Sequence, residues 1–129
     1  MLYALPPDPQ AALITFLSTH TDVAAISGMR VSSTKLDTPQ PRIQVTALPG
    51  ETTQPFEESA EFQVDCWGGT ETQALTLART VCAAIYELTT QSDTVTSAYP
   101  TVRPFASHDP TTGRPRFICQ LQITQSPAA

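Results

Sequence analysis

The stretch from Ala60 to Leu88, AEFQVDCWGGTETQALTLARTVCAAIYEL, decides the fold because its hydrophobic period changes at the Gly68-Gly69 pair. Before the glycines, polar and apolar residues alternate, which is the pattern of a β-strand with one buried face. The residues expected to face the core are Phe62, Val64 and Cys66, and those expected to face solvent are Glu61, Gln63 and Asp65. The stretch therefore predicts a strand that turns directly into a helix.

A long helix is predicted after the glycines, from Thr70 to Leu88. Thr70 is a residue type that caps helix N-termini, and Glu71 lies where a negative charge interacts favourably with the helix dipole. Apolar residues recur at helical spacing, namely Ala74, Leu75, Leu77, Ala78, Val81, Cys82, Ile85 and Leu88. This stripe is wider than a lone surface helix needs, so we expect the helix to lie across a sheet and to meet a second helix or another subunit.

The remaining sequence predicts further helices and strands around this unit. Asp8 and Pro9 are typical of a helix N-terminus, and that helix is expected to end near His20, before a short helix that stops at Gly28. The expected strands are Met29 to Ser33 at a sheet edge, Arg42 to Leu48 with Ile43, Val45 and Ala47 inward, Thr101 to Ser107, and Arg116 to Thr124 with Phe117, Cys119, Leu121 and Ile123 inward. Residues 91–98 are expected to be irregular. The pattern predicts an α+β fold, an antiparallel sheet of about four strands with helices packed on one face.

The 129 residues are expected to form a single domain, residues 1–129, with loose ends at both termini. No apolar run approaches the roughly 20 residues of a membrane-spanning helix, and no signal peptide is recognisable, so we expect a chain made in the cytoplasm without a membrane partner. A net charge of −5 argues against sequence-independent DNA binding, which needs clustered Lys and Arg. The three cysteines, Cys66, Cys82 and Cys119, fall on predicted buried faces and are interpreted as small buried residues.

Patterns of catalytic and cofactor-binding residues are sparse. Ser107, His108 and Asp109 are the residue types of a nucleophilic triad, but consecutive strand residues point to opposite faces, so a catalytic role is not favoured. His20 is interpreted as a capping residue at a helix C-terminus, where its charged form suits the dipole. The sequence has no zinc-binding spacing and no glycine-rich phosphate loop, and we predict neither enzyme activity nor a cofactor.

One acidic cluster stands out, made by Glu57, Glu58, Glu61 and Asp65. Carboxylates can bind hard cations, but no glycine-turned loop focuses these side chains, so a solvated acidic face is favoured over a metal site.

Two apolar residues, Trp67 and Ile118, fall on the polar faces of their strands. They are either ordinary exposed hydrophobic residues or anchors of a subunit interface, since interface cores are enriched in aromatic residues. The connector from Glu51 to Ser59 is longer than a usual hairpin loop and contains one apolar residue, Phe56. We expect a protruding arm there that serves assembly, with Phe56 as a further candidate interface residue.

Several features follow one another in a particular order between Asp8 and Thr124. They are the opening helix, the segment DVAAISGMRV at 22–31, the strand PRIQV at 41–45, the strand end VDCWGG at 64–69, the helix from Glu71 to Leu88, and a closing hairpin from Asp109 with FICQL at 117–121. This order resembles that of the tail terminator (tail completion) proteins of siphovirus-type long-tailed bacteriophages. The likeness is one of order and spacing, and residues 51–59 and 91–101 have no counterpart in it.

The resemblance implies a structural virion protein assembled in the host cytoplasm. Tail terminators form a hexameric ring that caps the tail tube, ends tube polymerisation and provides the docking surface for the head-neck assembly, while DNA passes through the lumen without specific binding. The implied partners are further copies of the chain, the major tail tube protein and the head-neck connector proteins, at the head-proximal end of the tail. The family implies no catalytic residues. In such a ring, the acidic residues Glu57, Glu58, Glu61 and Asp65 are candidates for an acidic lumen, where repulsion between like charges would keep DNA moving through. Two alternatives remain: another ring-forming neck protein (head-completion or connector), and, more distantly, a small cytoplasmic enzyme or ligand-binding module.

Overall fold

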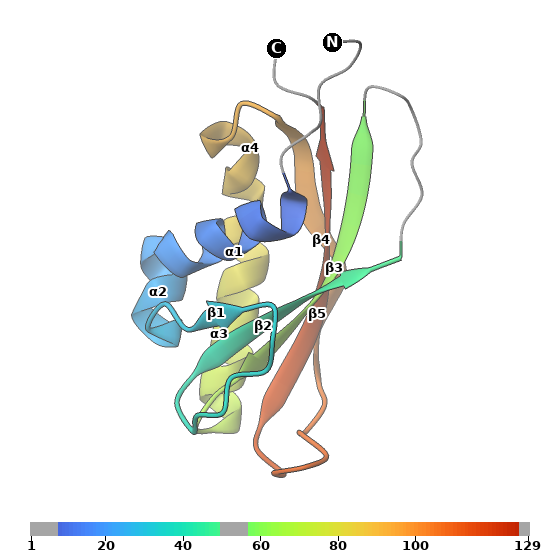
Figure 1. The fold of residues 1–129 in the computed structure, drawn as a ribbon. Coiled ribbons are helices and arrows are strands. Elements are labelled where there is room, and N and C mark those ends of the chain that lie inside the picture. The colour runs from blue at the N-terminus through green and yellow to red at the C-terminus, as the bar shows by residue number, and fades with distance from the viewer. Residues whose placement is uncertain (1–7, 50–56, 127–129) are drawn as a thin grey trace.

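The computed structural model describes residues 8–49 and 57–126, which form two layers (Figure 1). A five-stranded sheet makes one layer, and the helices lie on one of its faces. The elements are α1 (Pro9–Thr19), α2 (Thr21–Ser27), β1 (Val31–Ser32), β2 (Arg42–Leu48), β3 (Glu58–Trp67), α3 (Glu71–Ala84), η1 (Ile85–Glu87, a 3₁₀ turn), α4 (Leu88–Gln91), β4 (Val95–Ala106) and β5 (Arg116–Gln125). The α+β fold with helices on one face of the sheet is confirmed.

The strand order is β1-β2-β3-β5-β4, so β3 lies in the middle of the sheet. Neighbouring strands are antiparallel except for β1 and β2, which pair in parallel. The expected purely antiparallel sheet is therefore corrected to a mixed one, because residues 33–41 carry the chain back to the end of the sheet where β1 began. Val45, Val64 and Cys119 lie side by side on β2, β3 and β5, and all three are fully buried beneath the helices.

The first two helices begin and end as the sequence predicts. The Asp8 carboxylate accepts hydrogen bonds from the backbone N–H groups of Gln10 and Ala11, at 3.0 and 3.4 Å, and so caps α1. Gly28 ends α2 with φ of 62°, the left-handed conformation that glycine adopts without steric cost. The predicted edge strand is present as β1, two residues long.

The helix α3 supplies the centre of the core. Thr70 caps it by accepting a hydrogen bond from the Gln73 N–H at 3.1 Å. Its buried residues are Ala74, Leu77, Ala78, Val81 and Ala84, and the helical path continues through η1 and α4 to bury Ile85 and Leu88. As expected, α3 packs both on the sheet and against a second helix, α2.

Gly68 allows this helix to start directly at the end of β3. A Cβ atom at this position would lie 2.5 Å from the backbone nitrogen of Ala74, closer than any real Cβ contact. A side chain here would therefore push the first turn of α3 away from the strand.

Three sequence expectations differ from the structure. Residues 95–98 were expected to be irregular but belong to β4, in which Val95 and Ala98 are buried. The sequence did not indicate this strand because Thr96 and Pro100 interrupt its apolar pattern. Ala47 is exposed and lines a surface pocket beside the start of α1. Leu75 and Cys82 are half-buried at the margins of the stripe.

Residues 1–7, 50–56 and 127–129 lie outside the described residues, and with them most of the expected arm, Phe56 and the loose ends. Within the described ranges, no helix is both long and apolar enough to span a membrane.

Ile85→Ala tests how much the core depends on this helical path. Ile85 is fully buried, so the substitution is expected to lower the free energy of unfolding by about 2–5 kcal/mol through lost burial and a cavity. Denaturant unfolding followed by circular dichroism measures the loss. The neighbouring Tyr86→Ala is the control, because Tyr86 is 58% exposed and should change the unfolding free energy little. Equal losses in the two variants would contradict the placement of the core.

Candidate functional site

A cluster of polar side chains surrounds Trp67, at the last position of β3. By strand alternation Trp67 lies on the face away from the helices, yet it is only 1% exposed. Three cationic groups lie against its indole ring: the guanidinium carbon of Arg42 at 4.4 Å from the ring centroid, that of Arg116 at 5.7 Å, and the Lys35 ammonium at 5.9 Å. Such cation–π contacts are strongest where water is excluded.

Asp109 completes the cluster from the turn between β4 and β5. Its Oδ2 atom accepts the Trp67 indole N–H at 3.0 Å and lies 2.6 Å from the Lys35 ammonium. Its Oδ1 atom accepts the backbone N–H groups of Thr111 and Thr112, at 2.8 and 3.4 Å. The Lys35 ammonium, with these N–H donors, holds the pKa of the Asp109 carboxyl well below its usual range.

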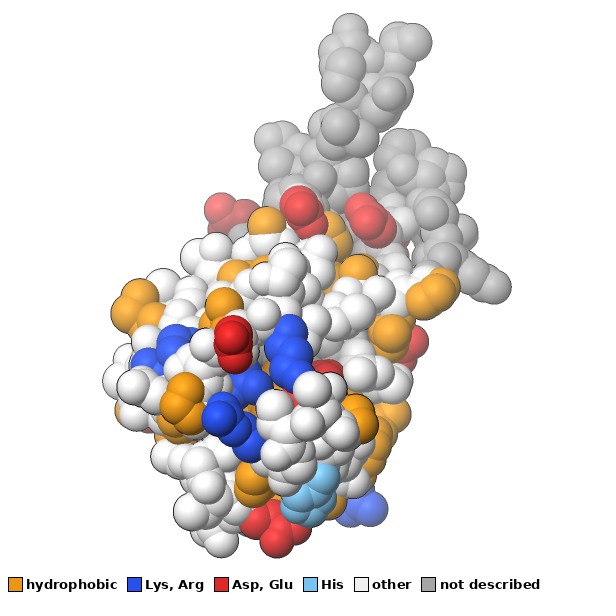
Figure 2. Space-filling model, turned by 60° about the horizontal axis from the view of Figure 1, so that its bottom comes forward, with side chains coloured by type: hydrophobic (Ala, Val, Ile, Leu, Met, Phe, Trp, Pro, Cys, Tyr) orange, Lys and Arg blue, Asp and Glu red, His pale blue; other side chains and the backbone are white. Residues whose placement is uncertain are grey.

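The Trp67 cluster (Lys35, Arg42, Trp67, Asp109 and Arg116) joins segments that are distant in sequence. Arg42 comes from β2, Arg116 from β5 and Lys35 from the segment after β1. Basic side chains gather at this end of the molecule (Figure 2). Asp109 and Trp67 are buried and hydrogen-bonded to each other, so the cluster stabilises this end of the sheet and is not an open binding site.

The exposed position expected for Trp67 and Ile118 is wrong. Ile118 is 7% exposed and lies between Asp65 on β3 and Phe105 on β4. Trp67 is covered by Lys35 and Asp109, which are distant in sequence, so the strand pattern alone did not indicate its burial. A subunit contact at this end of the sheet stays a prediction, but these two side chains do not offer the surface for it.

The acidic cluster does not form one surface. Asp65, expected to face solvent, is 7% exposed, lies 3.5 Å from the Arg116 guanidinium and accepts a hydrogen bond from Gln63 at 3.0 Å. Alternation along β3 places Glu58 on the opposite face from Glu57 and Glu61. Glu61 accepts a hydrogen bond from the Thr101 hydroxyl at 3.0 Å. Within residues 8–49 and 57–126, no group of three or more His, Cys, Asp or Glu side chains is placed to hold a metal ion.

The three residues of the possible triad have different surroundings. Ser107 meets the Arg116 guanidinium at 3.1 Å, His108 is exposed, and Asp109 belongs to the Trp67 cluster. The backbone of His20 caps α1, while its Nε2 atom lies 2.5 Å from Glu87 in η1. That pair joins residues far apart in sequence, so sequence reasoning missed it.

The cysteines are free thiols on the helix side of the sheet. Cys66 and Cys119 are fully buried and Cys82 is half-buried. Burial raises the pKa of the Cys66 thiol well above its usual value, so it stays protonated, in keeping with a packing role.

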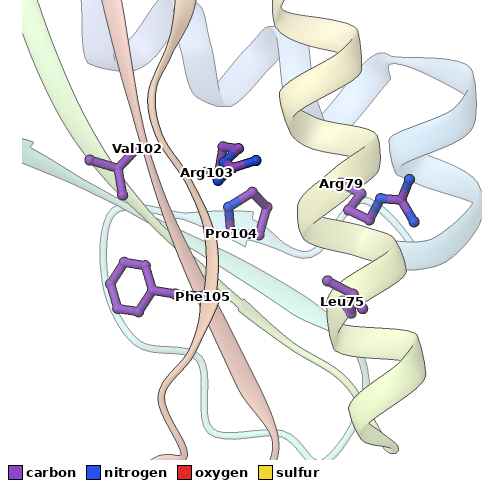
Figure 3. A pocket seen from close by; sticks show the side chains of 6 residues that line it. All are labelled: Leu75, Arg79, Val102, Arg103, Pro104 and Phe105. Atoms are coloured by element: carbon purple, nitrogen blue, oxygen red, sulfur yellow. The ribbon is translucent and has the colours of Figure 1, made fainter.

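A groove at the open edge of β4 was not predicted from the sequence. Its volume is about 500 Å³, and its lining consists of Leu75 and Arg79 of α3 with Val102, Arg103, Pro104 and Phe105 of β4. Figure 3 shows Arg103 and Pro104 on the side of β4 that faces α3, and Phe105 on the other side. The sequence signal that could have indicated this edge is the presence of Pro100 and Pro104 in one strand, beside apolar residues.

Comparison with known proteins gives a likeness of fold. A chain of a solved structure described as the virion of a native gene transfer agent (GTA) particle superposes with a TM-score of 0.66 and 16% sequence identity. The match covers 92% of this chain and 94% of that chain, so the likeness of fold extends over nearly the full length of both. No protein-family model matches the sequence, and no curated protein matches it significantly.

Asp109→Asn tests the electrostatic part of the Trp67 cluster. Because the folded-state pKa of Asp109 is depressed, its contribution to stability is present above its unfolded pKa of about 3.9 and is lost as the pH falls further. The melting temperature of Asp109→Asn is expected to be lower than wild type at neutral pH, with the difference shrinking below about pH 4. A difference in melting temperature that stays constant across this pH range would contradict an ionised Asp109 in the Trp67 cluster.

Trp67→Ser tests whether Trp67 is a core or an interface residue. Removing a buried aromatic side chain typically costs about 3–5 kcal/mol, so the variant should unfold at much lower denaturant concentration. Trp67→Phe keeps a ring between the cations but loses the N–H donor to Asp109, and should be intermediate. A Trp67→Ser protein as stable as wild type would show that the indole is not part of the monomer core.

Proposed function

We propose that this chain is a tail terminator: a structural virion protein that forms a ring on the end of a phage-type tail tube. The ring would end tube polymerisation, provide the docking surface for the head-neck assembly and let DNA pass through its lumen. Its partners would be further copies of itself, in a hexamer, the major tail tube protein and the connector proteins. It would act at the head-proximal end of the tail.

The observation that carries this proposal is the likeness of fold to a chain of the gene transfer agent virion. That likeness extends over nearly the full length of both chains, so it is not limited to one common motif. It supports a role as a virion component. The order of sequence features between Asp8 and Thr124 supports the narrower assignment to a tail terminator.

The geometry of the polar side chains favours assembly over catalysis. The buried carboxylates Asp65 and Asp109 are engaged by Arg116, Lys35 and Trp67. General acid–base chemistry needs such groups to face a substrate, and here they are turned to their own chain. An enzyme or ligand-binding module is therefore the less supported alternative.

The proposal includes an acidic lumen, and fewer of the four acidic residues are candidates to line it than the sequence suggested. Glu57 and Glu61 remain candidates, because they are half-buried on the face of β3 away from the helices. Asp65 is no longer proposed as a lumen residue, because it is buried and paired with Arg116. Glu58 is not proposed either, because it lies on the helix-covered face of β3. Repulsion from the remaining carboxylates would keep DNA from adhering.

The experiment is a capping assay with tail-tube subunits from the same particle. Wild-type protein is expected to bind one end of each polymerising tube and to limit tube length, as seen by electron microscopy of negatively stained samples. Bovine serum albumin at equal concentration is the control for non-specific effects. Tubes that grow to the same lengths with and without the protein would contradict the tail-terminator assignment. Binding to head portals but not to tubes would favour the alternative, a head-completion or connector protein.

A further inference from the structure

The three cysteine thiols lie close together beneath α3. Cys66 on β3 and Cys119 on β5 both belong to the helix-covered face of the sheet, because Cys66 pairs with Phe117 and Cys119 pairs with Val64. Cys82 comes from α3 and packs against the same hydrophobic core. The thiols are near enough that each of the two strand cysteines feels the charge of the others. The fold thus gathers three sulfur atoms that are far apart in the sequence.

Two of these thiols are in direct contact. The Cys119 thiol donates a hydrogen bond to the Cys82 sulfur, so the contact joins α3 to β5. In a disulfide the two sulfur atoms lie about 2.05 Å apart. Thiols that already touch can therefore be joined by a small approach of their side chains, without a rearrangement of the fold.

The two thiols of this pair differ in their access to solvent. Cys82 is half-buried at the margin of the apolar stripe of α3, whereas Cys119 is 0% exposed. A small reagent in solution therefore approaches the pair from the side of Cys82. Cys119 lies behind it, where it can meet a product formed on the Cys82 sulfur.

The hydrogen bond also makes Cys82 the better nucleophile. It lowers the pKa of the Cys82 thiol below its usual value, because the proton donated by Cys119 stabilises the Cys82 thiolate. The same bond, together with burial, raises the pKa of Cys119, which stays protonated. The thiolate is the reactive form of cysteine, and an accessible thiol of lowered pKa next to a second thiol is typical of sites of reversible oxidation.

We propose that Cys82 and Cys119 form a redox-reactive dithiol, in which Cys82 reacts with peroxides and Cys119 converts the product to a disulfide. The Cys82 thiolate attacks one oxygen of hydrogen peroxide, the O–O bond breaks, and a sulfenic acid forms as hydroxide leaves with the proton that Cys82 had lost. The Cys119 sulfur then attacks the Cys82 sulfur, the S–O bond breaks, and the leaving hydroxide takes the Cys119 proton. Two thiols are oxidised to one disulfide, and one peroxide is reduced to two water molecules.

The third cysteine is expected to take no part in this reaction. Cys66 is 0% exposed, and burial raises the pKa of its thiol, so it remains a packing residue. The disulfide between Cys82 and Cys119 would tie the central helix to the sheet that it covers. Its formation does not depend on the tail-terminator function proposed above. In a virion component, the dithiol would stay reduced in the cytoplasm and would form the bond in an oxidising environment.

The test is oxidation of the folded wild-type protein with hydrogen peroxide, followed by unfolding, alkylation of free thiols and mass spectrometry. The monomer is expected to lose two hydrogen atoms and to keep one alkylatable thiol, with Cys82 joined to Cys119 in the peptide map. Dithiothreitol should restore all three free thiols. In the folded, reduced protein, Cys82 should react with iodoacetamide about tenfold or more faster than Cys66.

Matched variants separate the roles of the three cysteines. Cys119→Ser keeps a hydrogen-bond donor beside Cys82 but cannot form the disulfide, so dimedone should trap the sulfenic acid on Cys82. Cys82→Ser removes the reacting thiol and should leave the two remaining thiols free at the same peroxide dose. Cys66→Ala should form the disulfide as wild type does. Circular dichroism checks that each variant is folded, and the wild-type measurement itself needs no substitution.

Three results would overturn the proposal. They are a folded wild-type protein that keeps three free thiols at a peroxide dose that oxidises the urea-unfolded chain, a disulfide that includes Cys66, or a folded Cys119→Ser variant without a dimedone adduct on Cys82. These outcomes are separable from those of the capping assay, which is carried out with reduced protein. Failure to cap tubes would leave the dithiol standing, and failure to form the disulfide would leave the tail-terminator function standing.

Discussion

The close approach of Gly68 to the first turn of α3 is the constraint on which the rest of the structure depends. With no Cβ at this position, the backbone of β3 passes against the nitrogen of Ala74, and the helix turns back at once across the sheet. The buried side of α3 then covers the inward rows of β2, β3 and β5, where Val45, Val64 and Cys119 lie side by side. The remaining helices pack around this unit on the same face of the sheet.

The other face of the sheet is stabilised by different means. None of the helices in the described residues covers it, and at one end its apolar residue Trp67 is enclosed by cationic side chains and by the carboxylate of Asp109. Burying these charges is tolerable because each meets an opposite charge, an aromatic face or an N–H donor. One end of the sheet is thereby held by polar contacts that strand residues make with each other and with Lys35 and Asp109 outside the strands, while the helix side is held by hydrophobic packing.

Within the described residues, large exposed hydrophobic side chains occur near both edges of the sheet. At the β4 edge, Arg79 and Arg103 have no ion-pair partner among the described residues, and Phe105 is exposed. Met29, next to β1, is exposed on backbone with a positive φ. The arrangement of sheet and helices is shared with a chain of a gene transfer agent virion.

The sequence by itself determined the class of fold, because periodicity, capping residues and glycines are local signals. They predicted α1, α2, the strand-glycine-helix unit and the inward residues of β3 correctly. The sequence could not predict the parallel pairing of β1, the early start of β4, or the burial of Trp67, Asp65 and Ile118. Those depend on contacts between residues far apart in the chain, such as Trp67 with Asp109, which periodicity does not record. Tertiary structure alone decided which polar and aromatic side chains are enclosed and which remain free at the sheet edges, since solvent exposure depends on what the rest of the chain covers.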